Sequence, residues 1–179
     1  MARLVLLFAL ATLAALALQT MLPYWLPLGP YVPDLVLILA VDLGMRHHSA
    51  IAALMAFVMG YAIDAFSGTQ VGLNAFMITL VFLLAYELST KLLVTNVIVG
   101  MLAVFVGVLI KDLGSIAISS GMAGLTGNPA LMRTLLGQAA ISALLAPIVF
   151  AAMARSKKIL GLLAPGRRED NSGDRRWLT

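Results

Sequence analysis

In this chain of 179 residues, 61% are hydrophobic and only 11% are charged, which excludes an ordinary soluble domain. There is no cysteine, so disulfides and thiolate metal sites are excluded, and most of the 12 basic residues lie in one C-terminal segment beside an apolar run. That pattern orients a protein in lipid, so we expect an integral membrane protein with no metal, no cofactor and no nucleic-acid partner.

Six apolar segments follow one another and predict an all-α fold with about six transmembrane helices in one bundle. They cover residues 4–22, 33–45, 50–66, 73–88, 93–118 and 130–154. The second is short for the roughly 30 Å hydrocarbon core, which leaves a partial or re-entrant segment open. The first resembles a signal peptide in its flanks, but its apolar run is longer than usual for one. We expect a transmembrane domain over residues 1–154 and a basic, flexible cytoplasmic tail over residues 155–179.

The basic residues also predict the orientation. With six crossings, Arg3, Arg46, Lys91 and the basic residues after position 154 fall on one side, whereas Arg133 lies in a loop on the other. Cytoplasmic loops carry the excess of lysine and arginine. Both termini are therefore expected in the cytoplasm, and the loops after the third and fifth segments outside.

Several charged residues fall within the predicted spans. Asp64, Lys111 and Asp112 are expected in the outer half of the membrane, where they could meet. An unpaired charge at such depth costs at least about 2.5–3.5 kcal/mol on insertion scales, so structural pairing is the simplest interpretation. A transport or proton-relay role and snorkelling of Lys111 are the alternatives. Asp42 is expected to pair with Arg46, four residues further along the helix.

Other polar residues have simpler explanations. Asp34, beside Pro33, is expected to serve the first turn of the second helix, where the helix dipole favours an acid. His47 and His48 are typical of a turn, because adjacent side chains diverge and no third metal ligand lies nearby. The sequence contains no HExxH, P-loop, GxSxG or paired-glutamate arrangement. We therefore expect no enzymatic activity.

The fifth apolar segment carries glycines at intervals of seven residues. These are Gly100, Gly107, Gly114 and Gly121. Small residues on one helix face let backbones approach closely in lipid, so the spacing predicts a helix-packing seam. A leucine at Gly107 or Gly114 is expected to disrupt it.

The stretch between the third and fourth segments is the most informative, because it sets an acid and a glycine-rich turn between two apolar runs. The residues of interest are Gly60, Asp64, Ser67, Gly68, Gly72 and Asn74. Gly60, Asp64 and Gly68 share one helical face, which indicates close packing. We expect Asp64 to accept hydrogen bonds from backbone N–H groups of the turn, with help from Asn74. The alternative is a functional intramembrane acid.

The order of these features resembles the MreD family of rod shape-determining membrane proteins. The resemblance covers roughly residues 30 to 90. It is carried by Pro33-Asp34-Leu-Val-Leu-Ile-Leu, a short basic turn, Asp64-Ala-Phe-Ser-Gly and Gly72-Leu-Asn-Ala. It implies a fold similar to the substrate-binding S-components of energy-coupling-factor transporters.

The resemblance also implies a function. It indicates a non-enzymatic scaffold of the elongation machinery in the bacterial inner membrane, which binds an MreC-like coiled-coil membrane protein and membrane lipid. An MreB-type actin-like filament, a RodA-type glycosyltransferase and a penicillin-binding transpeptidase would be direct or indirect partners. The turn that contains Asp64 would help to form a partner-binding surface. The alternative is the substrate-binding membrane subunit of a vitamin-type transporter, which would need an outward-facing pocket with polar walls.

The topology can be tested with reporter fusions. We expect a reporter after Met45 and a reporter at the C-terminus to be active in the cytoplasm, because the alternative orientation places several basic residues outside. A fusion after Gly68 should report the external side. A C-terminal fusion that reports the external side would contradict the six-crossing topology.

Overall fold

The computed structural model describes residues 2–25, 31–68, 70–91, 97–120, 129–159 and 161, and these residues form helices and short connections. The helices are α1 (Ala2–Trp25), α2 (Leu35–Arg46), α3 (Ala50–Ser67), α4 (Leu73–Lys91), α5 (Val97–Ser120) and α6 (Pro129–Ile159). All except α2 are long and apolar enough to cross a membrane. The predicted class, an all-α membrane protein with about six helices, is confirmed.

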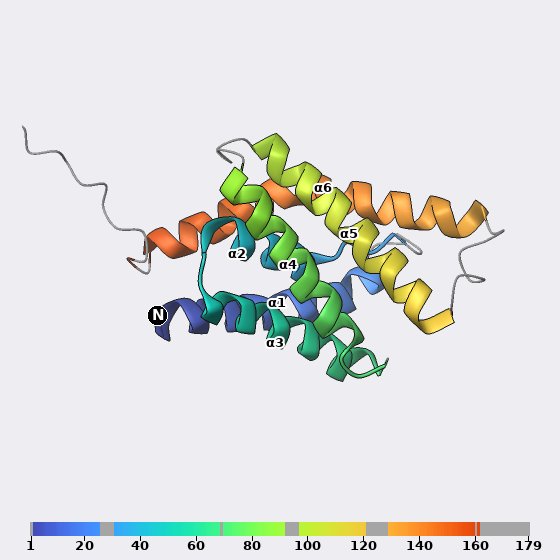
Figure 1. Cartoon of the computed structure of the whole chain (residues 1–179), viewed down its shortest axis with the longest axis horizontal. Coiled ribbons are helices and arrows are strands. Elements are labelled where there is room, and N and C mark those ends of the chain that lie inside the picture. The colour runs from blue at the N-terminus through green and yellow to red at the C-terminus, as the bar shows by residue number, and fades with distance from the viewer. Residues whose placement is uncertain are drawn as a thin grey trace, which may run out of the picture.

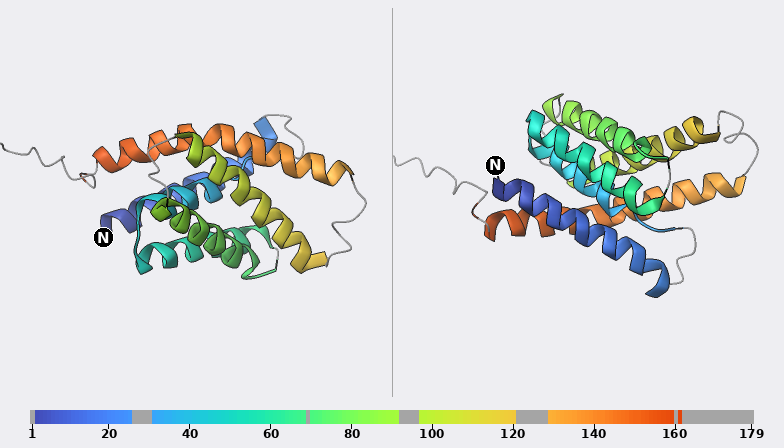
Figure 2. Two further views of the ribbon diagram at one scale, coloured as in Figure 1. Left: turned by 45° about the horizontal axis from the view of Figure 1, so that its top comes forward. Right: turned by 90° about the horizontal axis from the view of Figure 1, so that it is seen from below.

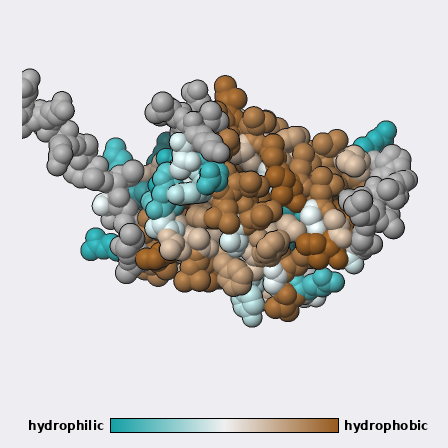
Figure 3. Space-filling model, in the orientation of Figure 1, coloured by the Kyte–Doolittle hydropathy of each residue, from teal (hydrophilic) through white to brown (hydrophobic). Residues whose placement is uncertain are grey.

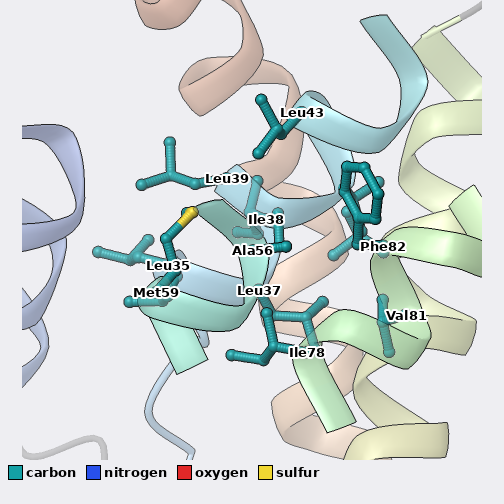
Figure 4. Packing of buried hydrophobic residues seen from close by; sticks show 14 of the residues in the cluster. Leu35, Leu37, Ile38, Leu39, Leu43, Ala56, Met59, Ile78, Val81 and Phe82 are labelled. Atoms are coloured by element: carbon teal, nitrogen blue, oxygen red, sulfur yellow. The ribbon is translucent and has the colours of Figure 1, made fainter. Parts of the chain in front are cut away.

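Helix α2 forms the centre of the bundle. Every residue from Leu35 to Gly44 is buried, and α2 contacts each of the other five helices. Figure 1 shows it in the interior, with α4 passing in front. Its apolar side chains pack with α3 and α4, where Leu37 lies close to Ile78 (Figure 4). With 12 residues, or about 18 Å of helix, α2 is too short to span the hydrocarbon core alone.

The five longer helices surround α2 and expose large apolar side chains. Examples are Leu6 on α1, Leu54 on α3, Phe76 on α4, Leu102 on α5 and Leu144 on α6. Hydrophobic residues cover the middle of the face in Figure 3, whereas hydrophilic residues gather toward its ends. Such an extensive apolar surface is typical of a bundle that faces lipid.

The helix boundaries differ from the expected ones at two prolines and at the C-terminus. Helix α1 continues through Pro23 to Trp25, and α2 begins at Leu35, two residues after Pro33. We expected the transmembrane domain to end at residue 154, but α6 continues to Ile159. The first basic residues of the expected tail are therefore helical. Apart from Gly161, the remainder of that segment lies outside the described residues.

The two ends of the bundle are named here by the connections they carry. The α3–α4 end holds the turn from Ser67 to Gly72, and the α2–α3 end holds His47 and His48. The views in Figure 2 show α5 running toward the end of the bundle that is far from the N-terminus and α6 returning toward the N-terminal end of α1. Asp34, before α2, contacts Lys111 in the later part of α5, and Asp42, near the end of α2, contacts Lys157 at the end of α6. The two ends of α2 therefore lie near different ends of the bundle.

Two glycines let helices approach at backbone distance. A Cβ atom added at Gly60 of α3 would lie 2.5 Å from the Cα atom of Ala75 in α4. A Cβ atom at Gly44 of α2 would lie 2.7 Å from the carbonyl oxygen of Phe82, also in α4. Backbone atoms cannot rotate away, so α3 and α2 reach α4 this closely only with glycine at these positions.

The glycines of α5 do not form one seam of this kind. Added Cβ atoms at Gly107 and Gly114 would meet the side chains of Val81 and Met77 in α4, whereas Gly100 faces the ring of Phe150 in α6. Gly121 lies outside the described residues. The close contacts at these glycines are thus divided among α2, α4 and α6 and are made by side chains, not by backbone.

We predict that Gly60→Ala will destabilise the protein more than Gly107→Ala. The methyl group at position 60 would overlap the α4 backbone, and overpacking of this kind costs roughly 1–3 kcal/mol. At position 107 the nearest atom, at 2.8 Å, is Cγ1 of Val81, a side-chain atom that can give by a small shift, whereas the backbone of α4 cannot. Thermal unfolding in detergent compares the two variants, and equal losses would contradict this assignment of the close contacts.

Candidate functional site

The carboxylate of Asp64 lies against the beginning of α4. Asp64 is 1% exposed, and its Oδ2 atom accepts hydrogen bonds from the backbone N–H groups of Gly72 (2.9 Å) and Ala75 (3.1 Å). Its Oδ1 atom accepts from the backbone N–H of Asn74 (3.1 Å) and from the side-chain amide of the same residue (2.9 Å). One buried side chain of α3 therefore satisfies several donors at the start of α4.

These contacts make Asp64 a helix cap supplied by another helix. The first N–H groups of a helix have no partner within it, and the helix dipole favours an anion there. Gly72 precedes α4 with a φ of 95° and has no side chain to act as a cap. At the other end of the turn, Gly68 closes α3 in the left-handed conformation, with a φ of 61°. The hydrogen bonds expected of Asp64 and Asn74 are present, and a role of this turn in partner binding stays a prediction.

A second buried carboxylate, Asp34, lies at the N-terminus of α2. Its Oδ1 atom accepts the backbone N–H of Leu37 at 3.0 Å, as expected for an acid that serves the first turn. Its Oδ2 atom lies 2.5 Å from Nζ of Lys111 in α5, and Lys111 also lies 3.2 Å from a carboxylate oxygen of Asp112. The backbone N–H of Asp34 donates to Oγ of Ser142 in α6. The start of α2 is therefore bound to both α5 and α6.

Of the three residues that could meet, Lys111 and Asp112 do pair, at 3.2 Å, but Asp64 does not join them. The oxygens of Asp64 are occupied by the N-terminus of α4, so this acid needs no cation. The second acid beside Lys111 is Asp34 and not Asp64. The predicted topology could have suggested this pair, because it places Asp34 and Lys111 at a similar depth in the membrane. Asp34 begins a helix that runs inward, and Lys111 lies near the end of a helix that runs outward.

A third buried carboxylate, Asp42, lies near the C-terminus of α2. Its Oδ1 atom is 2.6 Å from Nε of Arg46, which confirms the expected pair. Its Oδ2 atom is 2.7 Å from Nζ of Lys157 in α6, which in turn lies 4.9 Å from the centre of the Phe8 ring. The contact with Lys157 was missed because that residue falls in the segment expected to be a flexible tail.

The two histidines lie beside this cluster. His47 follows α2, and its backbone N–H donates to the carbonyl of Leu43. Burial and the nearby ammonium of Lys157 lower the pKa of His47, which favours the neutral ring. The ring of His48 lies 2.9 Å from the hydroxyl of Ser89 in α4. Among the described residues, no group of three or more acidic or histidine side chains could hold a metal ion.

The family of this chain can be assigned from its sequence. Residues 1–155 match the family model for rod shape-determining protein MreD. This protein belongs to the MreD family. The match extends from α1 almost to the end of α6, well beyond the segment that carries the resemblance in the sequence. As an MreD-family protein, it is a membrane protein involved in determining rod shape.

Searches of the curated proteins and of the solved structures return no significant match. The expected likeness between this MreD-family fold and the transporter S-components therefore stays a prediction.

We predict that Asp42→Ala will destabilise the bundle strongly. Lys157 is 3% exposed and would keep a buried charge without its nearest carboxylate, and removing one partner of a buried pair costs about 3–5 kcal/mol. The double variant Asp42→Ala/Lys157→Met should be more stable than the single variant, because it leaves no unpaired ammonium. Chemical unfolding in detergent gives both values, and additive losses would show that the pair is not coupled.

Proposed function

We propose that this MreD-family protein is a non-enzymatic scaffold of the cell-elongation machinery in the bacterial inner membrane. It binds an MreC-like coiled-coil membrane protein. Through this contact it acts, directly or indirectly, with an MreB-type filament, a RodA-type glycosyltransferase and a penicillin-binding transpeptidase. Both termini face the cytoplasm, and the α3–α4 end faces the cell exterior.

The observation that supports this proposal is the anchored start of α4 at the α3–α4 end. Ser67 and Val71 are exposed there, while the buried Asp64 binds the backbone N–H groups of Gly72, Asn74 and Ala75. A surface that is ordered before binding loses less conformational entropy when a partner docks. Exposed side chains beside an anchored helix start, in a member of a family involved in rod shape, support a partner-binding role for this turn.

The buried ion pairs are compatible with a static role. Asp34, Asp42 and Lys111 all have partners of opposite charge within the bundle. Charges that are paired and enclosed in this way hold helices in position and need no substrate to neutralise them. We therefore assign Asp42, Lys111 and Asp112 a structural role, and not one in proton relay.

The proposal predicts that Asp64→Ala will make rod-shaped cells rounder. The change removes a charge-assisted hydrogen-bond acceptor worth on the order of 1.5–3 kcal/mol, which loosens the turn while the helices stay inserted. Cell shape and co-purification of the coiled-coil partner are the measurements, made in cells that carry the variant as the only copy. If the protein functions instead as a transporter subunit, the variant should lose uptake of a small molecule and keep normal shape.

Ser49→Ala is the matched control for this experiment. Ser49 caps the other end of α3 by accepting the N–H of Ala52 at 3.2 Å, so its loss weakens a cap at the α2–α3 end, typically by about 1 kcal/mol. It should leave cell shape and partner binding intact. If Asp64→Ala protein accumulates normally, retains the partner and supports normal rods, the role proposed for the turn is wrong.

A further inference from the structure

A polar pocket of about 310 Å³ lies at the α3–α4 end, between α1, α3, α5, α6 and the segment that leads into α2. Its polar lining consists of Gln19, Thr20, Asp34, Ser67, Lys111 and Gln138. The volume is at the lower end of the roughly 300–1,000 Å³ typical of ligand sites. The polar pocket is therefore large enough for a small polar group.

The hydrogen-bonding capacity of the polar pocket is only partly used. Gln19 donates through Nε2 to the carbonyl of Pro33 and to Asp34, which leaves its carbonyl oxygen as an acceptor. Within the described part of the chain, the side chains of Ser67 and Gln138 have no hydrogen-bond partner. Both can donate and accept. The unused groups suit a ligand that also does both, as a hydroxyl group does.

The charge of the polar pocket disfavours an anionic ligand. Its cation, Lys111, already contacts carboxylate oxygens of both Asp34 and Asp112. Lys111 is therefore already neutralised by its own neighbours. A free phosphate or carboxylate would find no available cation there, whereas an uncharged hydroxylated group needs none.

An apolar groove of about 470 Å³ continues from the polar pocket toward the α2–α3 end. It runs between α1 and α3, which contact each other (Figure 1). Leu13 lines the apolar groove and Leu16, one helical turn further along α1, lines the polar pocket. On α3, the adjacent residues Ala62 and Ile63 line the groove and the pocket respectively. The two hollows therefore follow one crevice, polar at one end and apolar along the rest.

We propose that this crevice binds a single membrane lipid with an uncharged, hydroxyl-bearing head group, such as a sugar unit. The head group occupies the polar pocket, and an acyl chain lies along the apolar groove. On α1 the residues that line the crevice extend from Val5 to Thr20, which is about 22 Å of helix. The hydrocarbon layer of one leaflet is roughly 15 Å deep, so the crevice is long enough for an acyl chain and a head group. A partner's transmembrane helix would fill the apolar groove but would bring no hydroxyl groups to the polar pocket. The proposal goes beyond the scaffold role, although Ser67 lies both in the polar pocket and at the turn proposed to bind partners.

Native mass spectrometry of the purified full-length protein tests this proposal. The protein is held in tetraethylene glycol mono-octyl ether, which carries no sugar, and titrated with a monoglucosyl diacylglycerol. Gln138→Leu removes an amide from the polar pocket and should weaken binding about tenfold. Ala9→Phe fills the apolar groove and should weaken it by a similar factor. Ala14→Phe is the matched control, because Ala14 is exposed on α1 and lines neither hollow.

We expect the glycolipid to bind more weakly to Gln138→Leu and Ala9→Phe and with unchanged affinity to Ala14→Phe. Dodecyl maltoside, which has a sugar head and an alkyl chain, should displace it. Thermal unfolding of each variant confirms that the protein is folded. Equal binding of phosphatidic acid would overturn the proposal, because it would show that an uncharged head group is not selected. If methyl glucoside binds as tightly as the lipid, and Ala9→Phe leaves its affinity unchanged, the ligand is a small soluble molecule. That result would also overturn the proposal. Loss of the coiled-coil partner in Ala9→Phe, with lipid binding unchanged, would assign the apolar groove to a protein helix and also overturn it.

Discussion

A carboxylate removed from water must find a cation or several N–H donors, and α2 carries such a group near each end. Asp34 is held by Lys111, and Asp42 by Arg46 and Lys157. The N-terminus of α2, positive by its dipole, meets a cluster with an excess of acids, while its C-terminus meets a cluster with an excess of bases. These contacts fix the position of a 12-residue helix that is too short to be positioned by the membrane thickness.

The remaining helices are arranged around that fixed centre by contacts of two kinds. Glycines at positions 44 and 60 bring α2 and α3 to the backbone of α4, and Asp64 then caps α4 from α3. The capping carboxylate links the end of one helix to the start of the next more firmly than a flexible loop would. The start of α4 is therefore anchored at the α3–α4 end, and the lipid-facing surfaces of the long helices need no such precision.

Contacts within one helix or across one turn could be predicted from the sequence, and contacts between distant helices could not. The apolar runs indicated the helices, and the spacing of Asp42 and Arg46 indicated their pair. Lys111 and Lys157 lie 77 and 115 residues from the acids they bind, and helical periodicity identifies the face of a residue but not the neighbour of that face. The same limit applies to the glycines of α5, whose spacing indicated close packing but not which helices, or that side chains and not backbone, would lie against them.

The distance along the chain between these acids and their lysines has a consequence for biosynthesis. When α2 leaves the ribosome, the lysines that neutralise its two acids have not yet been made, and Arg46 is the only nearby cation on its own helix. A short segment with two acids inserts poorly by itself. It reaches its buried position only after α5 and α6 have been synthesised and inserted beside it. The central helix of this bundle, although second in the chain, is therefore among the last parts to settle during assembly.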